Sequence, residues 1–401
     1  MNKSQSIYRY MLFLVSPFIT LLSLVQYEDI RKSKWVLIFI FGYIGFIAMP
    51  IGDLEFYQTQ YYYSTDNSIS KLFVEFLQLK SGKFYTEISA IVFSWFFETH
   101  HFYFSFLFVV FGYFLFSLID LILFQLPTTQ KGFKFSVFVA LVFLFFSLRN
   151  TLSLPFYTGV LFTLLVIFKS IYLKQDYYLL LLILAPVFHF ALVIVWIPVV
   201  LFVLLKNSRI LCLSVWVMSV IVPNTIVSNQ LGALAQNGKG TLVESKYKTY
   251  ASEEGIKSLN KRYLKHSEEA NFKLSILNNT KVIIFNWFIP ILLLGYSIWQ
   301  IKRNEDPVYE KLMNLALLFL AFSNLTASVS NGERFQIFYA STVVFCILPY
   351  IFFTEKNRVF SIFATIIVVS GFFLSVMNLY ACNEFIPVRF FYSNIFLELL
   401  I

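Results

Sequence analysis

The chain has 401 residues, of which 58% are hydrophobic and only 13% are charged. Its 50 Phe and 24 Tyr give more apolar surface than a soluble domain of this size needs to bury. The three cysteines are widely separated and show no spacing typical of a disulfide framework or a metal site. A net charge of +9 could suit nucleic acid, but in so apolar a chain the distribution of Lys and Arg is more informative.

Apolar runs of about 15–25 residues alternate with polar loops along the whole chain. Because backbone groups in lipid must be satisfied within each segment, these runs predict an all-α polytopic membrane protein, with residues 1–401 forming a single transmembrane domain. The first run is followed by charged residues and no small-residue cleavage site, so we expect a retained helix and not a signal peptide. About 12 spans are predicted, at about 9–26, 35–50, 101–126, 134–148, 153–172, 177–188, 190–205, 210–228, 281–301, 312–329, 335–353 and 359–379.

The segment 51–100 is polar and aromatic and follows the second predicted span. It holds an amphipathic stretch, "SISKLFVEFLQLK", and a short apolar one, "YTEISAIVFSWFF". The second stretch is too short to cross a bilayer comfortably. We therefore predict surface or re-entrant helices in this segment.

The basic residues are unevenly divided between the two sides of the predicted bundle. With the spans above, six short loops on one side hold 14 of the 31 basic residues, whereas the short loops on the other side hold only Arg149 and Arg334. Cytoplasmic loops carry this excess. The 51–100 segment, the large loop 229–280 and the N-terminus are therefore expected outside. The basic residues of the six loops are Arg31, Lys32, Lys34, Lys131, Lys134, Lys169, Lys174, Lys206, Arg209, Lys302, Arg303, Lys311, Lys356 and Arg358.

Charged residues at predicted outer helix ends are candidates for function, because charge near a membrane is costly. Arg149 either snorkels to the interface or binds phosphate, which suits the planar donors of arginine. His189 is either a buried histidine or a partner for sugar or diphosphate, and Pro186 is expected to break its run into two short helices. Arg334 either pairs with the neighbouring Glu333 or binds an anion.

Carboxylates and tyrosines follow the second span in "IGDLEFYQTQYYY". Asp53 and Glu55 are either solvated loop carboxylates or chemical groups held at the membrane surface. Tyr57 belongs either to an interfacial aromatic belt or to a sugar-binding surface. His100 and His101 raise the alternative of a metal site, but adjacent histidines diverge on a helix and no further ligand is evident, so we expect no metal and no other cofactor.

These residues resemble a known family. "IGDLEFYQTQY" resembles the G-x-D-x-x-x-Y signature of EpsG/Wzy-type polysaccharide polymerases at Asp53 and Tyr57, although Gly52 adjoins the aspartate without the usual spacer. "GKFYTEISAIVFSWFF" is similar to a family segment in which Glu87 is the acid.

Two later motifs extend the resemblance over most of the chain. The run from "LRNTLSLP" to "APVFHF" resembles the family's core, with Arg149 and His189 at its Arg and His positions. Asn150 and Ser153 stand where the family usually has Gln and Ala. "GERFQIFYA" is similar to the late R-[FY]-x-x-Y-[FY] element, with Arg334.

The resemblance implies a GT-C-like helical fold in a bacterial inner membrane, and polymerisation of undecaprenyl-diphosphate-linked oligosaccharide repeats into O-antigen, capsule or exopolysaccharide on the outer face. We expect catalysis by Asp53, with His189 as second candidate base, and substrate binding by Arg149, Arg334, Tyr57 and Glu87. The expected partners are the lipid-linked oligosaccharide and membrane lipid, with a chain-length regulator as a candidate protein partner and no nucleic acid. A polysaccharide flippase or transporter, an O-antigen-ligase-like glycosyltransferase and a non-catalytic membrane scaffold are the alternatives.

Overall fold

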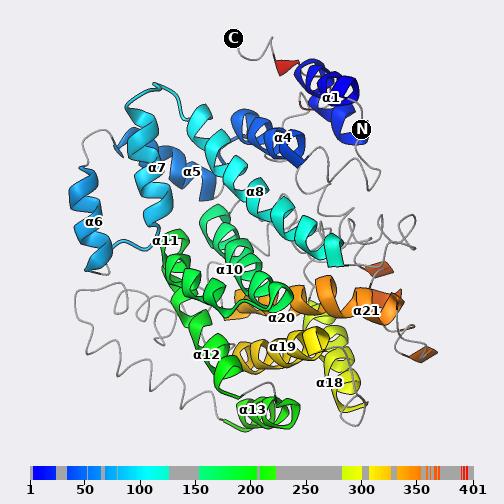
Figure 1. Cartoon of the computed structure of the whole chain (residues 1–401). Coiled ribbons are helices and arrows are strands. Elements are labelled where there is room, and N and C mark those ends of the chain that lie inside the picture. Colours follow the sequence, from blue (N-terminus) through cyan, green and yellow to red (C-terminus); the bar gives the residue numbers. More distant parts are fainter. Residues whose placement is uncertain are drawn as a thin grey trace, which may run out of the picture.

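The computed structural model describes residues 3–23, 34–51, 53–64, 68–78, 80–125, 153–205, 208–222, 282–299, 307–326 and 332–353, with isolated positions between 358 and 395. Within these ranges every regular element is a helix (Figure 1). Three helices are long and apolar enough to cross a membrane, namely α8 (His101–Gln125), α10 (Leu154–Leu173) and α19 (Pro307–Thr326). The predicted class, an all-α membrane protein, is confirmed. The span 134–148 and the loop 229–280 lie outside the described residues, as does most of 359–379.

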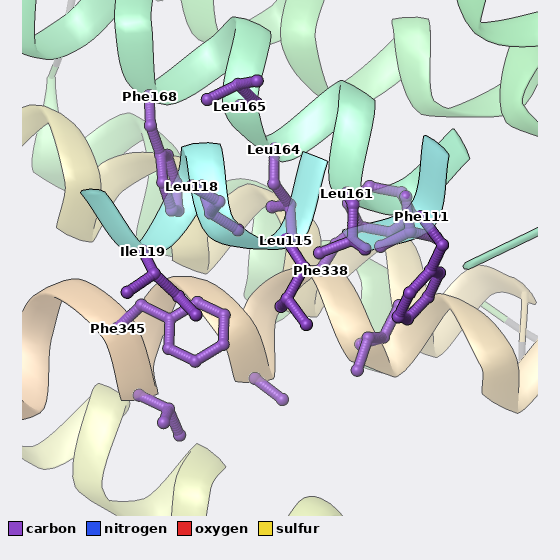
Figure 2. Close-up of a cluster of buried hydrophobic side chains, with 14 of the residues drawn as sticks. Phe111, Leu115, Leu118, Ile119, Leu161, Leu164, Leu165, Phe168, Phe338 and Phe345 are labelled. Atoms are coloured by element: carbon purple, nitrogen blue, oxygen red, sulfur yellow. The ribbon is translucent and has the colours of Figure 1, made fainter. Parts of the chain in front are cut away.

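The core lies where α8, α10 and the C-terminal part of the chain meet. That part contains η7 (Gly332–Phe335), α20 (Gln336–Thr342), the π-helical η8 (Val343–Ile347) and α21 (Leu348–Phe353). Apolar side chains from the three segments interdigitate in Figure 2, which labels Phe111, Leu115, Leu118, Ile119, Leu161, Leu164, Leu165, Phe168, Phe338 and Phe345. The α19 helix is buried almost all round, as expected for a helix that is apolar on every face.

The α4 helix (Lys34–Ile47) runs antiparallel to α8. Lys34 Nζ at its start donates to Ser117 Oγ near the end of α8 (2.8 Å). At the other end, His101 Nδ1 lies 2.7 Å from the Phe46 carbonyl oxygen. The chain between these helices therefore leaves and returns at the same end of the pair.

Three short helices occupy this excursion, namely α5 (Asp53–Tyr62), α6 (Ile69–Leu77) and α7 (Phe84–Ser94). Figure 1 shows α5 and α7 near the first turns of α8, with α6 on the side of α7 that faces away from α8. The sequence predicted helices near α6 and α7 but not α5, which is polar and lacks a helical apolar stripe. The α5 helix is held instead by the buried residues Leu54, Tyr57 and Tyr61, and the Tyr61 hydroxyl donates to the Phe97 carbonyl (2.5 Å).

The segment from 176 to 204 is built from unusually extended helices. It comprises η4 (Asp176–Leu184), α11 (Ala185–Phe188), η5 (Phe190–Val195) and α12 (Trp196–Leu204). A 3₁₀ helix rises about 2 Å per residue and an α-helix about 1.5 Å. The pair η4 and α11 is therefore about 24 Å long, and the pair η5 and α12 is about 26 Å long. The run breaks at His189, as expected from the predicted spans 177–188 and 190–205, and Pro186 lies in the first turn of α11, where its missing N–H is not needed.

The remaining helices flank this core. The predicted first span is interrupted at Ser16, before Pro17, and forms α1 (Lys3–Val15) and α2 (Pro17–Ser23). The α13 helix (Arg209–Ile221) runs parallel to α19: Arg209 pairs with Glu310 at one end (3.7 Å), and Asn324 Nδ2 donates to Ser219 Oγ at the other (3.1 Å). The π-helical η6 (Ile284–Phe288) continues directly into α18 (Ile289–Trp299).

Glycines set the close approach of α4 and α8. A Cβ added at Gly45 would lie 2.7 Å from the Phe104 carbonyl oxygen and 2.8 Å from Cγ of Phe108. One added at Gly42 would lie 2.6 Å from Cγ2 of Val109. Small residues at such spacing let membrane helices pack backbone to backbone.

We therefore predict that Gly45→Ala destabilises the protein by about 1–3 kcal/mol, because the Phe104 backbone cannot move aside without shifting α8. Thermal unfolding in detergent measures the loss. The matched control is Gly112→Ala, whose Cβ meets only the Phe41 side chain within 3.4 Å and should cost less. Equal stability of Gly45→Ala and the unaltered protein would contradict this packing.

Candidate functional site

Asp53 connects two distant parts of the chain. It is the first residue of α5 and is exposed. Its Oδ2 accepts a hydrogen bond from Ser153 Oγ (2.7 Å), 100 residues further along and directly before α10. The hydrogen bond fixes the carboxylate at the start of a long apolar helix while leaving it open to solvent.

Tyr57 lies one turn after Asp53 and is fully buried. Burial raises the pKa of the Tyr57 hydroxyl; the nearby Asp53 carboxylate raises it further, and the Arg334 guanidinium lowers it. The hydroxyl therefore stays protonated at neutral pH. Tyr57 is within electrostatic reach of both charged groups, so the structure brings an early carboxylate and a late arginine to one place.

Lys83 is a cation at this site that the sequence analysis missed. Its Nζ lies over the rings of Phe56 (4.6 Å) and Tyr57 (4.9 Å). Its backbone caps α7, since the Lys83 carbonyl accepts from the amides of Thr86 and Glu87. The only sequence signal was the spacing of four between Lys83 and Glu87, which places a cation and a carboxylate on one helix face.

Glu87 is paired within its own segment. Its carboxylate accepts a hydrogen bond from the Ser81 hydroxyl. Burial raises the pKa of the Glu87 carboxyl, whereas the Ser81 hydrogen bond and the Lys83 charge lower it. Glu87 thus belongs to the same group of residues as Lys83 and binds the Ser81 hydroxyl.

His189 forms the break between α11 and η5, where its backbone is extended. Its Nδ1 accepts a hydrogen bond from the Ala191 amide (3.2 Å), which caps η5. In a neutral imidazole the proton is then on Nε2, so this nitrogen is a donor. The next amide, of Phe190, donates to the Gly82 carbonyl (3.1 Å), and this ties the His189 break to the residue before Lys83.

The first turn of α10 connects these groups. The Phe156 ring contacts the His189 ring (centroids 5.4 Å) on one side and the Phe335 ring (5.9 Å) on the other. Phe335 follows Arg334, whose side chain is exposed in η7. Ser153, which binds Asp53, and Phe156, which contacts His189 and Phe335, are three residues apart at the start of α10. Asp53, His189 and Arg334 are therefore all connected to the same end of this helix.

Some predicted residues are not part of this convergence. Arg149 and Gly52 lie outside the described residues, and so does the side chain of Glu333. His100 and His101 do not diverge as expected, since their rings stack at 4.5 Å. His100 Nδ1 lies 3.1 Å from the Tyr62 hydroxyl, and among the described residues no group of three or more His, Cys, Asp or Glu could hold a metal ion.

No protein-family model, no curated protein and no solved structure matches the chain. The geometry described above is therefore the basis for assigning a function.

The partly buried Glu87 carboxyl predicts a pH effect on stability. Its folded pKa lies above the unfolded value of 4.5, so its contribution to stability is present below pH 4.5 and is lost as the pH rises through the raised pKa. Glu87→Gln should remove this part of the pH dependence, so that the variant gains stability relative to the unaltered protein between acid and neutral pH. Melting temperatures measured across this range, with the exposed Glu55→Gln as control, test it. An unchanged pH dependence in Glu87→Gln would refute the assignment.

Proposed function

We propose that the chain is a membrane glycosyltransferase that polymerises undecaprenyl-diphosphate-linked oligosaccharide repeats into a surface polysaccharide. The proposal places it in a bacterial inner membrane with its site on the outer face, and in a GT-C-like fold of about 12 spans. One observation carries it: the exposed Asp53 carboxylate, oriented by Ser153 at the start of α10, and the Arg334 guanidinium both interact electrostatically with the buried Tyr57. The resemblance to EpsG/Wzy-type polymerases at Asp53, Tyr57, His189 and Arg334 supports the same assignment.

The reaction needs a base for the acceptor hydroxyl. As the acceptor oxygen attacks the anomeric carbon of the donor, the bond from that carbon to the diphosphate breaks, and the hydroxyl proton must go to a base within hydrogen-bonding reach. Asp53 takes the proton in this scheme, because its carboxylate is exposed to solvent and oriented by Ser153. His189 then acts as a donor through Nε2, since Nδ1 is used in capping η5.

The leaving diphosphate needs fixed positive charge. Arg334 supplies planar donors that suit phosphate oxygens. Lys83, whose Nζ lies over the Tyr57 ring, supplies a second cation. Arg149 is a further proposed ligand on the sequence evidence.

The lipid must also reach the site from the bilayer. Exposed apolar side chains lie on the short helices beside it, on α6 and just after α7. They are Phe73, Val74, Leu77, Trp95 and Phe96. An amphipathic helix with such a face lies in the membrane interface, where it would border the path of a polyprenyl chain toward Asp53.

A transporter is the main alternative function. It would require ionisable groups along a pathway at mid-membrane. In the described spans α8, α10 and α19 the ionisable residues lie within a few residues of a helix end; they are His101, Asp120, Lys169, Glu310 and Lys311. The buried polar residues deeper in these spans are neutral, for example Thr163 and Asn314. This distribution favours chemistry at a membrane surface.

The decisive variant is Asp53→Asn, which keeps shape and hydrogen bonding but removes the base. Losing a general base costs about a hundred- to ten-thousandfold in rate, so long polymer should disappear from cells while the protein accumulates normally. Glu55→Gln is the matched control, because Glu55 is an exposed carboxylate on the same helix. Gel separation of the glycan by length measures the result, and a normal length distribution in Asp53→Asn would remove Asp53 from catalysis.

A further inference from the structure

A second polar cluster lies at the opposite end of the bundle from Asp53. It joins Lys34 at the start of α4, Ser117 and Asp120 near the end of α8, and Lys169 near the end of α10. Lys34 Nζ donates to Ser117 Oγ (2.8 Å), and Lys34 interacts electrostatically with both Asp120 and Lys169. Lys169 lies 16 residues after Ser153, so the cluster is about 24 Å from the Asp53 site along α10, most of the thickness of the hydrocarbon core.

The cluster contains more positive than negative charge. At the same end of α10 the carboxylate of Asp176, which accepts from Ser170 Oγ (3.4 Å), is offset by the charge of Lys174; Lys34, Lys169 and Asp120 together carry one net positive charge. All three side chains are partly buried, where water screens their repulsion less than at a free surface. A singly charged anion beside the two ammonium groups would offset this charge and lower the repulsion between Lys34 and Lys169.

Exposed aromatic side chains lie beside this cluster. Trp35 is 53% exposed and Tyr113 is 41% exposed, although both are large apolar groups, and their ring centroids are 6.1 Å apart. Lys34 Nζ lies over the Tyr113 ring (5.2 Å), and Lys169 Nζ lies over the Tyr178 ring (5.8 Å). Aromatic rings of this kind are enriched where lipid headgroups meet hydrocarbon.

We propose that Lys34 and Lys169 form a binding site for the phosphate headgroup of an anionic membrane lipid, with an acyl chain packed on Trp35 and Tyr113. The lysines supply the positive charge, the Ser117 hydroxyl fixes one ammonium group, and the exposed rings offer apolar surface directly beside it. The basic loops predicted on this side of the bundle place the headgroup in the cytoplasmic leaflet, where anionic lipids attract basic residues. The site makes no use of the glycosyl-transfer chemistry.

The test is thermal unfolding of the purified full-length protein in uncharged detergent with added lipid. Phosphatidylglycerol should raise the melting temperature by about 3 °C more than phosphatidylcholine, as a ligand that binds only the folded state does. Lys34→Gln and Lys169→Gln should each reduce this difference to near zero, whereas Lys34→Arg should retain it. Lys174→Gln, which changes an exposed lysine at the same end of α10, is the control and should behave as the unaltered protein.

Each other outcome counts against the site. Equal stabilisation of the unaltered protein by both lipids would overturn it, as would an equal loss in Lys174→Gln, which would indicate a general charge effect. Stabilisation of the same size by glycerol 3-phosphate alone would show that the lysines take a free phosphate and not a lipid. If Lys34→Gln does not fold, the Lys169→Gln result alone decides.

Discussion

Hydrocarbon offers a polypeptide no hydrogen-bond partners, and this constraint governs the arrangement of the described chain. In α8, α10 and α19 the backbone satisfies itself within each helix, and ionisable groups lie close to the ends. Where the helical path breaks, side chains or neighbouring backbone supply partners: at His189, the imidazole accepts from Ala191, and Phe190 donates to Gly82. The ionisable residues of these helices are therefore concentrated near two surfaces, which are about 24 Å apart along α10 from Ser153 to Lys169.

These two surfaces differ in chemistry. At the α10 start, an exposed carboxylate, a buried tyrosine, an arginine and a lysine come together, and they include the base and the positive charge that the proposed sugar transfer from a diphosphate needs. At the α10 end, two lysines and one carboxylate lie beside exposed aromatic rings, which suits a lipid headgroup. The two proposals therefore put a catalytic surface and a lipid-binding surface at opposite ends of α10.

Composition predicted the helical membrane class, because apolar runs of bilayer length have few other structures available. Helix ends predicted Asp53, Tyr57, His189 and Arg334 as candidates, and the described structure groups them. Lys83 was missed because its role depends on contact with Phe56 and Tyr57, which no spacing in its own segment reveals. The α5 helix was missed because it is polar and is held by tertiary packing of Leu54, and not by an apolar stripe.

The most direct measurement is of the side on which the Asp53 surface lies. In a chain whose cysteines are replaced, single cysteines are introduced at Glu55, beside the site, and at Gln175, just beyond the other end of α10; both positions are exposed. An impermeant thiol reagent should label Glu55→Cys in intact cells and Gln175→Cys only after permeabilisation. The reverse pattern would place the carboxylate, the arginine and the lysine in the cytoplasm and contradict polymerisation on the outer face.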